Sequence, residues 1–98
     1  MIRVTFFIDR GDESENYAVQ TFLPLLRDLP ELRRLEAARV IASATGELRA
    51  RIQIDLLFDD EAQMNTAFAS VEGRRISREI MNNAGAGIEM VTAESLAV

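Results

Sequence analysis

The chain has 98 residues, of which 48% are hydrophobic and 28% charged, and its formal net charge is −5. This length and composition predict one globular domain with a single core, residues 1–98, and exclude a disordered chain. The basic residues are all arginine and form no cluster larger than a pair, so we expect no nucleic-acid partner.

The N-terminal stretch IRVTFFID (residues 2–9) alternates between apolar and polar side chains, which predicts a half-buried strand and not a signal peptide. Residues 13–29 place apolar side chains three or four positions apart, which predicts a helix. This helix contains Pro24, although proline costs ~3 kcal/mol in a helix interior. Pro30 ends the helix, because the residue before a proline is forced out of helical geometry.

Residues 32–43 (LRRLEAARVIAS) lie between this proline and the turn ATGE. Alanine and arginine suit helices, but this position favours a strand. Residues 50–58 (ARIQIDLLF) form the clearest strand pattern in the chain, and the two strands with their connection predict a hairpin.

Residues 59–70 (DDEAQMNTAFAS) predict a helix that begins with a capping box formed by Asp60 and Gln63. After an interruption at Glu72-Gly73, residues 74–83 (RRISREIMNN) predict a further helical segment. The loop NAGAG then leads to a closing strand, IEMVT, at residues 88–92.

The resulting order of strand, helix, strand, strand, helix, strand predicts an α+β fold of the ferredoxin-like βαββαβ type. It has a four-stranded antiparallel sheet with helices on one face. The other face mixes charges of both signs with apolar side chains. An exposed face of a monomer is one interpretation, but we favour a homodimer in which two such faces pack together. The predicted dimer interface comprises Arg3, Phe7, Arg51, Gln53, Asp55 and Leu57.

Three stretches, MIRVTFFIDR, LPLLRDLPELRR and LFDDEAQMNTAFASVEGR, together resemble the EthD family. This family belongs to the dimeric α+β barrel superfamily, and the resemblance covers nearly the whole chain. It implies a homodimer whose two sheets close into a barrel, with a pocket in each subunit between sheet and helices. Members act on small hydrophobic or aromatic compounds or occur in their pathways, and many have no assigned activity.

The EthD family often places a histidine two residues before the helix proline. In this chain Phe22 stands at that position, and the sequence contains no histidine or cysteine at all. This excludes disulfides, thiolate sites and the commonest general base and metal ligand. We expect no metal, since the paired acids lie where helices begin. We also expect no cofactor.

Apolar side chains are expected between sheet and helices, where they form either a filled core or the walls of a ligand cavity. They are Phe6, Phe22, Met64, Phe68 and Met81. Tyr17 lies one turn before Thr21, and its hydroxyl is predicted either to orient a phenol or carbonyl substrate or to point to solvent. Asn82 and Asn83 are predicted either to bind substrate at the pocket mouth or simply to end a helix.

Asp55 is expected to pair with Arg3 or Arg51, and a general base with a raised pKa is the alternative.

Taken together, the features of the sequence favour a small cytoplasmic homodimer that binds an apolar or aromatic metabolite, with no membrane partner. Any chemistry would be cofactor-free isomerisation, cyclisation or monooxygenation. The alternative is a non-catalytic binding or accessory protein of the EthD type, which the missing histidine favours. The sequence leaves open which of the two applies.

Overall fold

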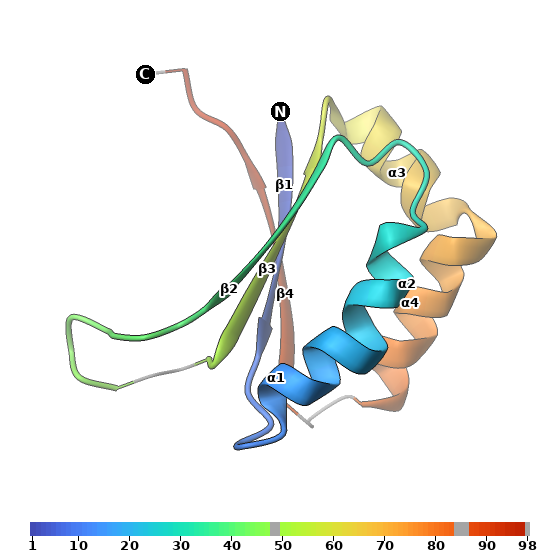
Figure 1. Cartoon of the computed structure of the whole chain (residues 1–98). Coiled ribbons are helices and arrows are strands. Elements are labelled where there is room, and N and C mark those ends of the chain that lie inside the picture. The colour runs from blue at the N-terminus through green and yellow to red at the C-terminus, as the bar shows by residue number, and fades with distance from the viewer. Residues whose placement is uncertain (48–49, 84–86, 98) are drawn as a thin grey trace.

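A four-stranded antiparallel sheet carries a layer of helices on one face in the computed structural model, which describes residues 1–47, 50–83 and 87–97 (Figure 1). The sheet order is β2-β3-β1-β4, as in the predicted ferredoxin-like fold. The strands are β1 (Ile2–Ile8), β2 (Arg34–Arg39), β3 (Ile52–Phe58) and β4 (Ile88–Glu94). The helical segments are α1 (Ser14–Tyr17), η1 (Ala18–Phe22), α2 (Leu23–Arg27), α3 (Glu61–Ala69) and α4 (Val71–Asn82). Across the described ranges, every helix is too short or too polar to span a membrane.

The first predicted helix is present, but it consists of the three successive segments α1, η1 and α2. The N–H of Leu23 donates to the carbonyl of Ala18, five residues earlier, which is the hydrogen bond of a π-type turn. This wide turn places Pro24 in the first turn of α2, where proline is tolerated. The helix ends at Arg27, two residues before the predicted end.

The core lies between the helices and the two central strands. Val4 and Phe6 of β1 and Ile54 of β3 are fully buried beneath the helix layer. The rings of Phe6 and Phe22 meet edge to face, with their centroids 5.0 Å apart. Burying a side chain of this size stabilises the fold by about 1.5–3 kcal/mol.

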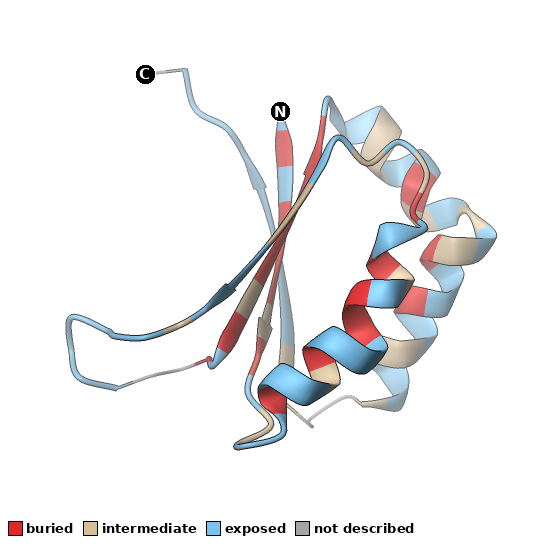
Figure 2. Cartoon of the chain, viewed as in Figure 1, coloured by how far each residue is buried: buried red, intermediate tan, exposed pale blue. Residues whose placement is uncertain are grey.

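The helix layer covers the central strands and leaves β2 largely open (Figure 2). Ala37 of β2 is paired with Ile54 of β3, so both side chains point toward the helices. Ile54 is fully buried, whereas Ala37 is exposed. The sheet is therefore wider than the part that the helices protect.

Two further predicted boundaries were wrong. The strand predicted over residues 32–43 spans only Arg34–Arg39, and the chain then leaves the sheet in an exposed connection. The helix break lies at Ser70 and not at Glu72-Gly73, both of which belong to α4. The Ser70 hydroxyl accepts a hydrogen bond from the N–H of Gly73 at 3.0 Å, and this cap begins α4. Part of the predicted loop 83–87 falls outside the described residues.

Gly73 occupies a position where α4 touches the end of α3. A Cβ there would lie 2.4 Å from both the Ala67 carbonyl oxygen and the Phe68 Cα. Alanine normally stabilises a helix relative to glycine by about 1 kcal/mol. We nevertheless expect Gly73→Ala to lower the free energy of unfolding by about 1–3 kcal/mol, because the backbone must shift. Urea unfolding measures this, and the exposed Arg75→Ala variant is the control. A more stable Gly73→Ala protein would contradict the close contact.

Candidate functional site

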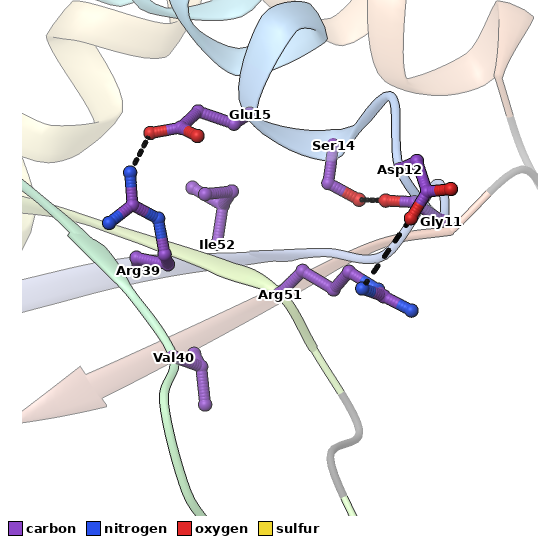
Figure 3. A pocket seen from close by; sticks show the side chains of 8 residues that line it. All are labelled: Gly11, Asp12, Ser14, Glu15, Arg39, Val40, Arg51 and Ile52. Atoms are coloured by element: carbon purple, nitrogen blue, oxygen red, sulfur yellow. Dashed lines mark hydrogen bonds and ion pairs between the residues drawn. The ribbon is translucent and has the colours of Figure 1, made fainter.

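A cleft opens between the first helical run and the uncovered strand β2 (Figure 3). Its first cavity has a volume of about 210 Å³. On the helix side it is lined by Gly11, Asp12, Ser14 and Glu15. On the sheet side it is lined by Arg39, Val40, Arg51 and Ile52. The cavity thus combines charged side chains of both signs with an apolar floor.

A second cavity, also of about 210 Å³, adjoins the first along η1 and β2. Its own lining is apolar and consists of Ala18, Val19, Leu23, Ala37 and Ala38. Glu15, Arg39 and Ile52 line both cavities. An ion pair between Arg39 and Glu15 joins β2 to α1 and so marks the boundary between a polar and an apolar half.

Arg51 is held loosely in the polar half. Its guanidinium lies 3.6 Å from Asp9 and 4.0 Å from Asp12, beyond hydrogen-bond distance in both cases. Arg51, one of the two partners expected for Asp55, thus lies near Asp9 and Asp12 instead. Ser14, by contrast, is buried and committed to the local turn, since its hydroxyl donates to the Gly11 carbonyl at 2.7 Å.

A second polar cluster connects α1 to α4. The Tyr17 hydroxyl donates to the Glu79 carboxylate at 2.7 Å, and the Arg10 guanidinium lies 4.2 Å from the centroid of the Tyr17 ring. Arg10 also donates to the side chain of Asn83 at 2.9 Å, and the Asn83 amide donates to Glu79 at 3.1 Å. The structure thus brings together two predicted residues, Tyr17 and Asn83. Arg10 and Glu79 were missed, although Glu79 stands one helical turn before Asn83.

The environment of Tyr17 raises its pKa above the ordinary value of about 10. Burial is the largest cause, followed by the hydrogen bond to Glu79 and the negative charge of that carboxylate, while Arg10 acts in the opposite direction. At neutral pH Tyr17 is therefore a neutral donor committed to Glu79, and its hydroxyl is not a general base.

The nine predicted substrate-binding residues do not line these cavities. Phe6 and Phe22 are fully buried against one another, which is the filled core of the alternative interpretation. Met64 and Phe68 pack partly buried against the core. Thr21, Met81 and Asn82 are exposed. A ligand role for the residues outside the filled core stays a prediction.

The open face of the sheet carries a buried carboxylate although no helix covers it. Asp55 is 7% exposed and accepts hydrogen bonds from the Thr5 hydroxyl at 2.5 Å and from the Gln53 amide at 3.1 Å. The Arg3 guanidinium lies 3.8 Å away, so the predicted Arg3–Asp55 pairing is confirmed.

A third cavity, of about 220 Å³, lies beside Phe7 and Gln53 under the β2–β3 connection.

Within the described ranges, no three acidic side chains come together in the way that a metal site requires.

No protein-family model and no curated protein matches the chain. Solved structures do match it over nearly its whole length. An ethyl tert-butyl ether D (EthD) family protein from Bacillus halodurans has a TM-score of 0.83 and 21% identity, covering 98% of this chain and 99% of the other. The chain shares the EthD fold.

Two further structures have the same fold. A dimeric ferredoxin-like protein of unknown function from Jannaschia sp. CCS1 has a TM-score of 0.71 and 16% identity, over 96% of this chain and 98% of the other. A hydroxynitrile lyase from Passiflora edulis has a TM-score of 0.68 and 13% identity, over 98% and 96%. At these identities the likeness concerns the fold, and it confirms the predicted ferredoxin-like α+β class.

Tyr17 gives the chain a well-isolated alkaline titration. It is the sole tyrosine in the sequence, so tyrosinate absorbance reports on this one side chain. Because folding raises the pKa of Tyr17, its contribution to stability is fully present below about pH 10 and is lost as the pH rises through the folded-state pKa.

We expect tyrosinate absorbance of the folded protein to rise only above pH 10, at a higher pH than in urea-unfolded protein. Glu79→Gln should lower this pKa but leave it above the ordinary value, because burial remains the main cause. Tyr17→Phe should remove the alkaline loss of stability. Equal pKa values for folded and unfolded protein would contradict the Tyr17–Glu79 contact.

Proposed function

We propose that the protein is a homodimer of the EthD type that binds a small apolar or aromatic metabolite in the cleft between α1–η1 and β2. The observation that carries this proposal is the open apolar half of the cleft. Val19 is 49% exposed there, and Ala37 points toward the helices without being covered. Ligand sites are commonly apolar concavities with a few polar groups at one end. The proposal includes a single domain, residues 1–98, and a cytoplasmic location.

Binding without turnover is the function that we favour over catalysis. Phe22, at the position where the EthD family often has a histidine, is packed in the core, and the Tyr17 hydroxyl is engaged by Glu79. Cofactor-free isomerisation, cyclisation or oxygenation is the second candidate. The Passiflora edulis hydroxynitrile lyase supports this second candidate only in that it is an enzyme with the same fold. In this chain such a reaction would depend on the carboxylates of Asp12 and Glu15 as proton acceptors.

The proposed dimer packs the open faces of two sheets against each other. Strand pairing arranges this face in three rows across β2, β3, β1 and β4. The rows are Arg34–Leu57–Arg3–Ala93, Glu36–Asp55–Thr5–Val91 and Ala38–Gln53–Phe7–Glu89. The first row carries two arginines and the second row two carboxylates, with apolar side chains in all three rows, so a two-fold axis can bring opposite charges together. The dimeric protein from Jannaschia sp. CCS1 supports the dimeric state.

A charge placed on this face should prevent dimerisation. Val91 is 41% exposed in a single chain, so Val91→Asp costs a monomer little. In the dimer it buries an unpaired carboxylate. We expect light scattering at micromolar concentration to give a dimer mass for the natural chain and half that mass for Val91→Asp. The matched control is Val71→Asp, a similarly exposed valine in the first turn of α4. A monomeric natural chain would contradict the dimer.

A larger side chain in the apolar half should block ligand binding. With phenylethanol as a neutral aromatic probe, we expect NMR shift changes in the natural chain to centre on Val19 and Ala37. Ala37→Phe should weaken binding about tenfold or more, because it fills the cleft. Ala62→Phe, on the exposed face of α3, is the control. Shift changes elsewhere, or unaltered binding to Ala37→Phe, would contradict this location.

A further inference from the structure

The Arg39–Glu15 ion pair spans the cleft from one wall to the other. Arg39 belongs to β2 and Glu15 to α1, and Figure 3 shows the two side chains directed toward one another, with Ile52 beside them. Within the described ranges, this is the one side-chain hydrogen bond or ion pair that joins β2 to the first helical run. The pair therefore lies across the cleft and not along one of its walls.

The two cavities of the cleft meet at this pair. Both side chains and Ile52 line each cavity, and each cavity has a volume of about 210 Å³. Ligand pockets usually begin at about 300 Å³, a volume that neither cavity reaches alone and that the two together exceed. A ligand of ordinary size would therefore have to extend past the pair and occupy both halves.

The strand register and the helix spacing place the apolar half in line with the pair. Ala37 and Arg39 both lie on the helix-facing side of β2, two residues apart. On the opposite wall, Val19 follows Glu15 by one helical turn. Along the cleft, the apolar walls thus lead directly to the ion pair, and the first cavity lies beyond it.

The pair is weak enough for a ligand to displace it. Its two side chains are 65% and 57% exposed, and an ion pair at such a position changes an equilibrium by about fivefold at most. When the side chains separate, both charged groups turn to solvent and are hydrated again. Each methylene group that a ligand buries strengthens its binding by about fourfold. Two further buried methylenes therefore outweigh the pair.

The polar half favours neither sign of charge. Carboxylates oppose both of its arginines, Glu15 at Arg39 and the side chains of Asp9 and Asp12 at Arg51. A charged group that enters this half would meet a like charge as well as an opposite one. A hydroxyl group both donates and accepts hydrogen bonds, so it can use either kind of side chain. We therefore expect the end of a ligand that lies here to be uncharged.

We propose that the ligand of this cleft is an elongated, uncharged apolar molecule that spans both halves, and that the Arg39–Glu15 pair opens to admit it. This inference rests on the proposed ligand-binding function and adds to it the length of the ligand and the pair that determines this specificity. A short ligand leaves the pair closed and stays in the apolar half. A longer ligand separates the two side chains, lies over Ile52 and places its polar end in the first cavity.

Two uncharged probes of different length test where a ligand lies. They are phenylethanol and phenylhexanol, titrated into the natural chain and followed by protein-observed NMR. We expect phenylethanol to shift the signals of Val19 and Ala37, and phenylhexanol to shift those of Gly11 and Val40 in addition. Phenylhexanol should bind about tenfold more tightly or better, because it buries further methylenes. Shift changes from phenylhexanol that stay within the apolar half would overturn this inference. No binding of either probe would instead count against the proposed ligand-binding function itself.

Variants that break the pair test its role. Glu15→Ala should strengthen phenylhexanol binding about three- to fivefold and leave phenylethanol unchanged, because only the longer probe has to separate the pair. Arg39→Gln should have the same effect from the other wall, and the double variant should add nothing further, since each change breaks the same contact. Glu13→Ala, at an exposed position outside the lining of both cavities, is the control for loss of a negative charge. An equal gain for both probes, no gain for phenylhexanol, or additive effects of the two single variants would contradict the proposed opening of the pair.

Discussion

The edge-to-face contact between Phe6 and Phe22 determines where the first helical run lies on the sheet. Both rings are fully buried, and such a pair contributes about 0.5–1.5 kcal/mol beyond the burial of its area. Because Phe22 belongs to η1, the contact holds this segment over β1 and beside β2 without covering β2. Tyr17 stacks on Phe22 and extends the same arrangement to α4 through Glu79. The cleft is thus a consequence of where the aromatic core is placed.

The buried face of β1 could be predicted from alternation alone, since the helix-facing side chains of β1 are all buried. The type of sheet could be predicted from the order of strands and helices along the chain. The cleft could not, because its openness depends on which helix covers Ala37 and not on any local pattern. The Arg10–Asn83 hydrogen bond joins residues 73 positions apart, a distance at which periodicity carries no information. The break at Ser70 was missed because Gly73 resembles a helix breaker, whereas here it permits close packing of α3 and α4.

The buried carboxylate of Asp55 shows that the polar centre of the open face has its hydrogen-bond partners within a single chain. A buried charge is costly unless it is paired and hydrogen-bonded, and Thr5, Gln53 and Arg3 meet this condition within one chain. The row through Asp55 ends at Val91, an apolar side chain left in solvent. In the proposed dimer, association would bury the exposed apolar side chains at the edge of this face, and the charges would set the relative orientation of the two chains.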